Sequence, residues 1–376
     1  MMEHSFTSLI RTVLYNHFKE VASLLFDRSL LIQYLNIKTK SANRGSKSRG
    51  SFANLYAIYV LVEDYLSKGF GTKDKRGQYA NYAGAVYSDL LRRQRELPFG
   101  AKLQNHALNN RVNTEFEKYF PTSNLIPILR NQETNRYWIN ENLLLVSINN
   151  REYNIAPAVM EVVDEYIRVK QDAFIRFINQ CKVIREIGAE GEEQVADFCK
   201  KILAPNVDAR LFEIVSYSIL KHYYKDQVIY WGYEEANVVP EKLKLYKTGR
   251  TNANDGGIDF VMRPLGRFFQ VTETLDFKKY FLDIEKIEKY PVTFVVKSND
   301  SVGTILGRIK SNALKAYPVH SIVDKYMECI EEIINIPVLM DCFISIKDKG
   351  QVMGVLDEIV LQSKVEFNYD EEDMEV

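Results

Sequence analysis

Apolar side chains along the first third of the chain recur at helical spacing. Residues 5 to 36 carry them every three or four positions, which predicts a helix. A second helix is predicted for residues 52 to 70. Shorter helical pieces are predicted between residues 82 and 118, where Pro98 and Gly100 interrupt the pattern. The N-terminal part of the chain is therefore expected to be mainly helical.

The pattern changes several times before residue 225. Residues 38 to 51 (KTKSANRGSKSRGS) hold five basic residues and no acid, and this composition predicts a flexible basic loop. Residues 124 to 156 predict short strands and turns, whereas residues 156 to 201 and 209 to 225 predict helices.

After residue 225, short β-type runs alternate with helices. Four runs rich in Val, Ile, Phe and Tyr predict strands: QVIYWGY, GIDFVMR, RFFQVTE and VTFVVK. Helices are predicted at residues 276 to 290, 303 to 315 and 321 to 336, and the runs PVLMDCFISI and KVEFNY are candidates for further strands. From residue 209 the order is helix, three strands, helix, strand, helix. It predicts an α/β domain with a mixed sheet, because an antiparallel meander precedes a crossover.

The length of 376 residues suits two domains. The change of pattern predicts a mainly helical domain over residues 1 to 155 and an α/β domain over residues 156 to 376. The 49 basic and 50 acidic residues nearly cancel, so net charge does not indicate a nucleic-acid partner. Scattered cysteines disfavour a zinc site and fit a reducing cytoplasm. Neither a signal peptide nor a membrane span is predicted.

Side chains with candidate chemistry gather around one predicted hairpin. Asp259 follows a pair of glycines at the start of one apolar run, and Gln270 lies within the next run. Because strand side chains alternate, Gln270 and Thr272 are expected on one face. Glu213 is a carboxylate in an apolar stretch of the preceding helix, where burial is costly unless the group is paired or bound to metal. Asp259, Gln270 and Glu213 thus offer the oxygen ligands that Mg²⁺ prefers.

The runs DGGIDFV and FFQVT resemble the PD-(D/E)xK nuclease signature in its variant with Gln at the second acid. More narrowly, FEIVSYSIL, TGRTNANDGGIDF and FFQVTETLDF, in this order, resemble the HaeII-type family of type II restriction endonucleases. The resemblance implies a restriction-endonuclease-like core, a mixed central sheet flanked by helices, that hydrolyses DNA phosphodiester bonds with Mg²⁺. It makes Asp259 the metal-binding acid, puts Gln270 at the second acid and makes Glu213 the supplementary helix carboxylate.

Thr272 departs from the family pattern, which has Lys at this position. That Lys orients the attacking water or stabilises charge on the phosphorane, and Lys244, Lys247, Lys278 and Lys279 are candidates to replace it. The departure leaves a second hypothesis open, namely a catalytically degenerate DNA-binding protein on a nuclease fold. A repair nuclease that recognises DNA structure is a third hypothesis.

Candidate DNA contacts lie in three segments rich in basic and amide side chains. Such side chains contact phosphates, and Arg and Asn also contact base edges, although the same compositions suit solvated loops and helix caps. The segment just before Asp259 would neutralise the phosphates that flank the scissile bond. The candidates are Arg44, Lys47, Arg49, Arg111, Lys244, Lys247, Arg250, Asn252 and Asn254.

The resemblance also implies partners. An enzyme that cuts both strands of a symmetric site usually acts as a symmetric dimer, so a homodimer on double-stranded DNA is expected. A cognate DNA methyltransferase is the expected functional partner in a restriction-modification system, because a host must protect its own sites. The expected location is the cytoplasm, without membrane association.

Overall fold

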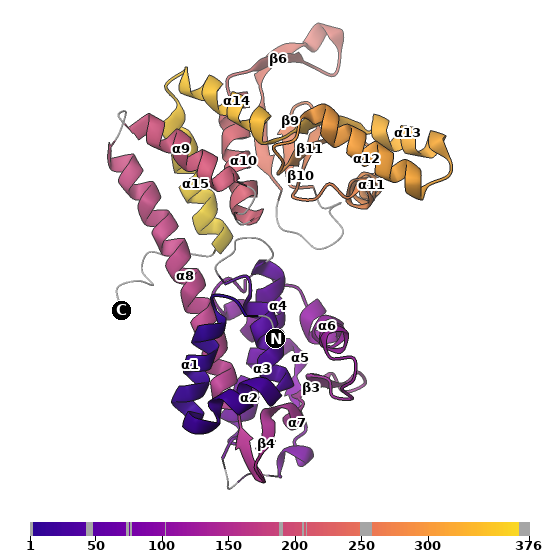
Figure 1. Cartoon of the computed structure of the whole chain (residues 1–376). Coiled ribbons are helices and arrows are strands. Elements are labelled where there is room, and N and C mark those ends of the chain that lie inside the picture. Colours follow the sequence, from indigo (N-terminus) through magenta and orange to yellow (C-terminus); the bar gives the residue numbers. More distant parts are fainter. Residues whose placement is uncertain are drawn as a thin grey trace. The chain divides into compact units, whose positions relative to one another are not determined.

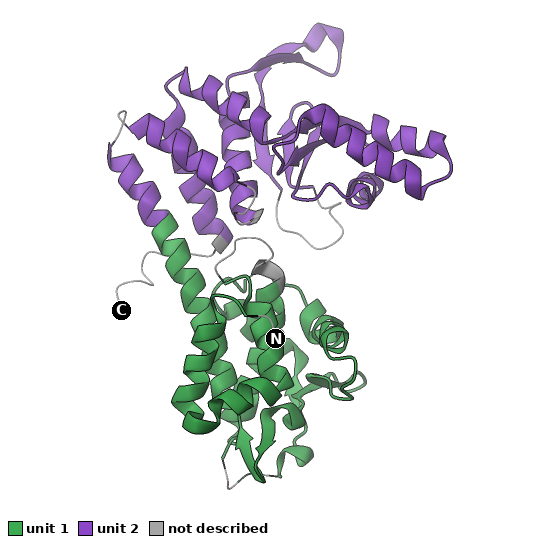
Figure 2. Cartoon of the chain, in the orientation of Figure 1, with its two compact units in different colours: residues 1–177 green, residues 178–376 purple. Residues whose placement is uncertain are grey.

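The computed structural model divides the chain into two compact units, residues 1 to 177 and residues 178 to 376 (Figure 2). The residues that the structure describes are 3–42, 48–72, 75, 77–101, 103–187, 191–204, 207, 209–248 and 258–367. The expected boundary between residues 155 and 156 falls where helix α8 (Ala156–Ile187) begins, whereas the division between the units lies inside that helix.

The first unit is mainly helical and has an aromatic core. Tyr34, Tyr56, Tyr65 and Phe116 are all fully buried, so these large rings fill the interior between the helices. Its helices are α1 (Thr7–Phe18), α2 (Ala22–Arg28), α3 (Leu30–Thr39), α4 (Ser48–Ser67), α5 (Tyr87–Glu96), the single π-helical turn η4 (Ala107–Arg111), α6 (Val112–Tyr119), α7 (Glu141–Leu144) and the first part of α8 (Figure 1).

The prediction of one continuous helix over residues 5 to 36 is wrong, because the segment forms three helices. Helix α1 ends where Lys19 adopts a positive φ of 51°. Helix α3 starts after Ser29, whose hydroxyl accepts a hydrogen bond from the backbone N–H of Ile32 at 3.2 Å. Apolar spacing continues through both breaks, so periodicity alone does not reveal them.

Short strands complete the first unit, as predicted for residues 124 to 156. Strands β1 (Ala85–Val86), β3 (Arg136–Ile139) and β2 (Ile128–Asn131) form an antiparallel sheet in that spatial order. Strands β4 (Leu145–Ile148) and β5 (Arg151–Asn154) form a separate hairpin.

A mixed five-stranded sheet forms the centre of the second unit, as the sequence predicts. Its spatial order is β12-β11-β10-β9-β8. The last three run as an antiparallel meander, and β10, β11 and β12 are parallel to one another. The strands are β8 (Lys244–Lys247), β9 (Phe260–Arg263), β10 (Arg267–Thr272), β11 (Val292–Val296) and β12 (Ile330–Ile334).

The composition of the meander differs from the prediction. The run QVIYWGY contributes β6 (Val228–Trp231), but this strand pairs with β7 (Val239–Lys242) in a separate hairpin. The first strand of the meander is β8, in which only Leu245 is buried. An edge strand with one buried side chain lacks an apolar run, and for that reason the pattern did not predict it.

Helices cover both faces of the sheet (Figure 1). On one face α10 (Ala209–Tyr224) packs against β8 and against α9 (Glu192–Leu203), α14 (Ile336–Lys347) and α15 (Val352–Phe367). On the other face α11 (Phe277–Lys286) and α12 (Val302–Ala316) form a core with the side chains of β11, and α13 (His320–Glu328) follows α12. No helix among the described residues has both the length and the apolar character to cross a bilayer.

Near the C-terminus three predictions are wrong. The run PVLMDCFISI lies in α14 and the start of KVEFNY lies in α15, whereas residues 330 to 334 form strand β12 rather than the end of a helix. Asn335 begins α14 by accepting a hydrogen bond from the N–H of Val338 at 3.0 Å. Short apolar runs fit a buried helix as well as a strand, and the Asn335 cap favours the helix here.

Candidate functional site

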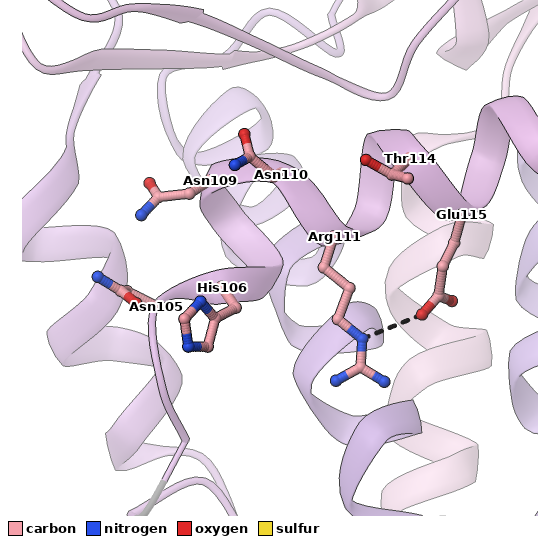
Figure 3. A pocket seen from close by; sticks show the side chains of 7 residues that line it. All are labelled: Asn105, His106, Asn109, Asn110, Arg111, Thr114 and Glu115. Carbon is pink, nitrogen blue, oxygen red and sulfur yellow. Dashed lines mark hydrogen bonds and ion pairs between the residues drawn. The ribbon is translucent and has the colours of Figure 1, made fainter. Parts of the chain in front are cut away.

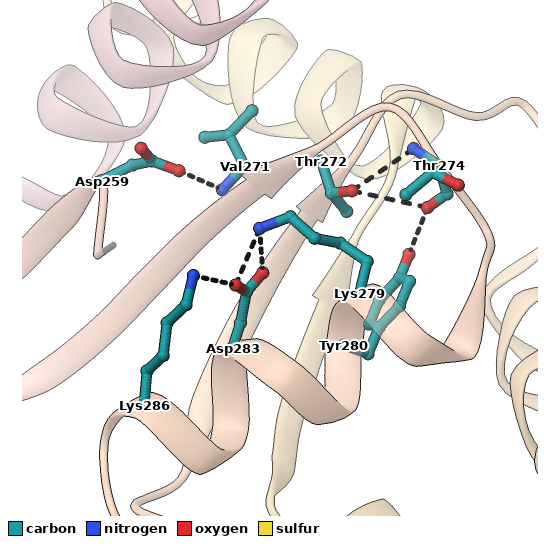
Figure 4. A network of polar contacts seen from close by, with 8 residues as sticks. All are labelled: Asp259, Val271, Thr272, Thr274, Lys279, Tyr280, Asp283 and Lys286. Carbon is teal, nitrogen blue, oxygen red and sulfur yellow. Dashed lines mark hydrogen bonds and ion pairs between the residues drawn. The ribbon is translucent and has the colours of Figure 1, made fainter. Parts of the chain in front are cut away.

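Asp259 lies beside Gln270 at the end of the β9–β10 hairpin. Its backbone N–H donates to the carbonyl of Phe269 at 3.0 Å, and its Oδ2 accepts a hydrogen bond from the N–H of Val271 at 2.7 Å (Figure 4). The bonds join Asp259 to Phe269 and Val271, the two neighbours of Gln270 in β10, so Asp259 lies opposite Gln270. The structure therefore brings together the acid and the amide that the sequence singled out.

The side chain of Gln270 is buried with an unsatisfied oxygen. The residue is 6% exposed, and its Oε1 has no hydrogen-bond partner among the described residues. A buried polar atom without a partner destabilises a fold by about 1–3 kcal/mol. A ligand that reached this atom and satisfied it would remove that cost.

Helix α10 brings Glu213 to the same end of the sheet. One turn further along, the Tyr217 hydroxyl donates to the carbonyl of Leu245 at 3.3 Å, and its ring packs on Phe260 with centroids 5.2 Å apart. This contact fixes the helix against β8 and β9. The carboxylate of Glu213 forms an ion pair with Lys247 Nζ at 2.8 Å, so the acid expected to need a partner has one.

Two carboxylates close together change the protonation of Asp259. Burial, and next the negative charge of Glu213, raise the pKa of Asp259 to about 7. The Val271 N–H and the ammonium groups of Lys279 and Lys247 act in the opposite direction but do not outweigh them. A site that penalises its own anion at neutral pH is one that added positive charge would stabilise.

A buried acid holds a lysine near this site. Asp283 on α11 is 1% exposed and receives Lys279 Nζ at 2.6 Å and Lys286 Nζ at 3.1 Å (Figure 4). Sequence reasoning named Lys279 but missed Asp283. The available signal was a carboxylate on the apolar face of a helix, the same signal that identified Glu213.

Thr272 is occupied within its own turn. Its Oγ1 accepts the N–H of Thr274 at 3.3 Å and donates to the carbonyl of Thr274 at 3.5 Å, in the turn that leads into α11 (Figure 4). The residue is 5% exposed. It shapes the backbone after β10 and brings no charge to the site.

A buried lysine that the sequence analysis did not name, Lys297, lies over the Phe212 ring on the α10 face of the sheet. The Lys297 side chain is 1% exposed and pairs with Glu273 at 2.7 Å, and it also donates to the carbonyl of Val207. Glu273 thus points away from the Thr272 face, as strand alternation predicts.

The remaining predicted residues have different outcomes. The structure gives Lys244 and Lys278 exposed positions and no contact with Asp259, whereas Lys247 is only 16% exposed and committed to Glu213. Arg111 lies in the first unit, paired with Glu115. Helix α4 includes Arg49, but its side chain is outside the described set. The candidates outside the described residues are Arg44, Lys47, Arg250, Asn252 and Asn254.

The donor set suits a hard cation only in part. Among the described residues, no three His, Cys, Asp or Glu side chains gather as a metal-binding group. Glu213, Asp259 and Gln270 offer carboxylate and amide oxygens instead: the charge of Glu213 acts on Asp259, and backbone hydrogen bonds place Asp259 opposite Gln270. Carboxylate and amide oxygens are the ligands of Mg²⁺, which keeps waters in its remaining positions. These side chains are therefore of the types that such an ion binds.

No family model, no curated protein and no solved structure matches the chain.

Proposed function

We propose that the protein is a type II restriction endonuclease, which hydrolyses phosphodiester bonds of double-stranded DNA at a specific sequence with Mg²⁺. One observation carries this proposal. Asp259, a carboxylate whose pKa is raised by burial and by Glu213, lies opposite Gln270, whose amide oxygen has no hydrogen-bond partner among the described residues. Asp259 has a single described N–H donor and Gln270 Oε1 has none, so a divalent cation would stabilise both side chains.

The proposed roles follow from the contacts of each side chain. Asp259, Gln270 and Glu213 would hold the ion, and the ion would supply polarisation of the phosphate and activation of water. The Val271 N–H occupies Oδ2 of Asp259 and fixes the orientation of the carboxylate. Lys247 neutralises Glu213 in the described structure. It would be freed to contact phosphate when Glu213 turns to the ion.

Lys279 takes the role of the lysine that Thr272 replaces. Its ammonium group lowers the pKa of Asp259 and so acts electrostatically on the acid that defines the site. Asp283 fixes its position from behind. A positioned cation here would stabilise the charge that develops on the phosphate in the transition state.

A second candidate function is a DNA-binding protein that has lost catalysis. The observation that favours it is the pairing of Lys279 with Asp283, because a neutralised lysine beside an uncharged Thr272 leaves the phosphate without a strong cation. A repair nuclease would use the same site chemistry and differ in its substrate.

The proposal includes the surroundings of the enzyme. A homodimer would cut both strands of a symmetric site, a DNA methyltransferase would protect host DNA, and both would act in the cytoplasm. A protein that stays monomeric on its DNA, measured by sedimentation, would count against the dimer.

Digestion of sequenced plasmids in Mg²⁺ tests the proposal. The wild type is expected to give discrete bands that EDTA abolishes. Asp259→Ala should reduce cleavage at least about 100-fold, because it removes a metal ligand. The matched control is Asp226→Ala, since Asp226 is an exposed acid of the same unit.

The alternatives give different results in this assay. Salt-sensitive DNA binding without cleavage would favour the degenerate protein. Cleavage of forks or flaps but not of intact plasmid would favour the repair nuclease.

A further inference from the structure

A polar hollow in the first unit lies at the π-helical turn η4. Its volume is about 470 Å³. The side chains around it carry amide, imidazole, guanidinium, hydroxyl and carboxylate groups (Figure 3). The lining residues are Asn105, His106, Asn109, Asn110, Arg111, Thr114 and Glu115.

The wide turn presents successive polar side chains. Ala107 and Leu108 are buried at 1% exposure and anchor η4 in the core, so Asn109, Asn110 and Arg111 follow one another at its surface. Single π-helical turns inside helices are frequently found at functional sites. Nothing in the nuclease site explains this turn.

The hydrogen bonds around the turn leave donors for a ligand. Asn109 Oδ1 accepts the hydroxyl of Tyr137 at 2.8 Å, and Asn110 Oδ1 accepts Arg130 Nη2 at 2.9 Å. Both amide oxygens are thus engaged by the β-sheet of this unit. Each asparagine keeps its NH₂ group as a donor, beside one further acceptor site on its oxygen.

Arg111 adds a third donor, and Glu115 holds its side chain in place. Its Nε donates to Glu115 Oε1 at 3.0 Å, while its side chain is 45% exposed. Burial opposes the charge on Glu115, but hydrogen bonds from Lys38 at 2.5 Å and from Arg111 outweigh it and lower the pKa of Glu115. The carboxylate therefore stays ionised and fixes the guanidinium, whose terminal nitrogens remain as donors.

A ligand for these three donors must present acceptors. In the major groove guanine offers two adjacent acceptors, O6 and N7, whereas adenine and cytosine each present an NH₂ donor and thymine presents a single acceptor beside a methyl group. Phosphate also presents only acceptors. The positive charges of Arg111, Arg130 and Lys38 exceed the negative charge of Glu115, so charge alone would also suit phosphate. The neutral amides beside Arg111 favour a planar base edge, and the selection below distinguishes the two ligands.

We propose that this hollow binds the major-groove edge of a guanine in double-stranded DNA, with Arg111 and Asn110 as specificity-determining residues. The proposal rests on the proposed function in assuming a DNA ligand. It goes further in naming the base and the residues that recognise it.

Selection from a pool of randomised DNA duplexes tests the proposal without cleavage. Duplexes retained by the protein in EDTA are sequenced for the wild type, Arg111→Ala, Asn110→Asp and Arg168→Ala. Asn110→Asp replaces a donor by an acceptor of the same size. Arg168→Ala is the matched control, because Arg168 is a 64% exposed arginine of the same unit whose loss changes net charge equally.

The wild type is expected to enrich guanine at a defined position. Arg111→Ala and Asn110→Asp should each lower that enrichment about 10- to 100-fold, with the other positions unchanged, while Arg168→Ala keeps the wild-type profile. Melting temperatures of the variants check that they are folded.

Three results would overturn the proposal. They are a wild-type pool without a guanine preference, an Arg111→Ala profile equal to the wild type, and a uniform loss of binding to all sequences, which would indicate a phosphate contact. A guanine preference without plasmid cleavage would refute the nuclease alone. Site-specific cleavage whose sequence preference survives Arg111→Ala would refute this inference alone.

Discussion

The pKa values of two carboxylates, one in each unit, shift in opposite directions. Glu115 receives hydrogen bonds from Lys38, Arg111 and Asn54, and its pKa is lowered despite burial. Asp259 receives one backbone N–H, lies near another carboxylate, and its pKa is raised to about 7. The first acid is complete within the protein, whereas the second would be stabilised by added positive charge.

This difference indicates that Glu115 holds neighbouring side chains in place, whereas we infer that Asp259 binds a ligand. Glu115 fixes the side chains around it and leaves donors for an uncharged partner. Asp259 and Gln270 retain unmet electrostatic and hydrogen-bonding demand. Unmet demand of this kind concentrates at functional sites, where it is maintained at the expense of stability.

The largest effect is expected from the removal of Lys279, the lysine that Asp283 holds in place. We expect Lys279→Ala to reduce DNA cleavage about 100- to 1,000-fold, because it removes the cation that would stabilise phosphate charge. Lys278→Ala serves as the control, since Lys278 is the exposed neighbour on the same helix. Single-turnover cleavage rates measure both, and equal rates for the two variants would exclude Lys279 from catalysis.

Removing the satisfied acid should affect stability rather than cation binding. Glu115→Ala leaves Lys38, which is 12% exposed, without its carboxylate, and we expect it to lower the free energy of unfolding by about 1–3 kcal/mol at pH 7. Because the pKa of Glu115 is lowered on folding, this contribution is present above the unfolded pKa and disappears as pH falls through the folded one.

Denaturant unfolding measures the loss. The control is Glu117→Ala, since Glu117 is an exposed acid on the same helix. If Glu115→Ala and Glu117→Ala were equally stable, Glu115 would not be the structural acid described here.

For Asp259 the dependence of stability on pH should have the opposite sign to that for Glu115, and the effect should be smaller. Folding raises the pKa of Asp259, so its contribution to stability is greatest below the unfolded pKa of 3.8 and is lost as pH rises towards 7. Asp259→Asn mimics the protonated form. In the absence of metal we expect it to raise the melting temperature by a few degrees at pH 8 and to have little effect at pH 4.

How much of the site could be predicted depended on the local context of each residue. Glu213 was detectable because a carboxylate within an apolar run is unusual in a single sequence, and Asp259 because it follows two glycines at the start of an apolar run. The ion pairs around them were not detectable, because Lys247, the partner of Glu213, comes from an edge strand without an apolar run, and Asp283, the partner of Lys279, comes from a helix. Tertiary contacts of this kind leave no trace in spacing.

The fold shows the same division. The helix predicted for residues 209 to 225 matches α10 closely. The region predicted as helical over residues 156 to 201 contains two helices, α8 and α9, and α4 begins at Ser48, within the segment predicted as a basic loop. The mixed sheet was predicted from the order of elements, but β6 was assigned to it in place of β8 because both hairpin strands and sheet strands carry β-type residues. The run in α14 was misassigned because a short apolar run does not determine its own backbone conformation.

The most direct test of the account uses Asp259→Asn, with melting at pH 8 without metal and plasmid cleavage in Mg²⁺ measured on the same preparation. We expect a variant that melts at a higher temperature than the wild type and no longer cuts DNA. Loss of activity could then not be attributed to unfolding. A variant that cuts plasmid as the wild type does, or one that melts at a lower temperature, would contradict the claim that Asp259 is an acid held in readiness for a cation.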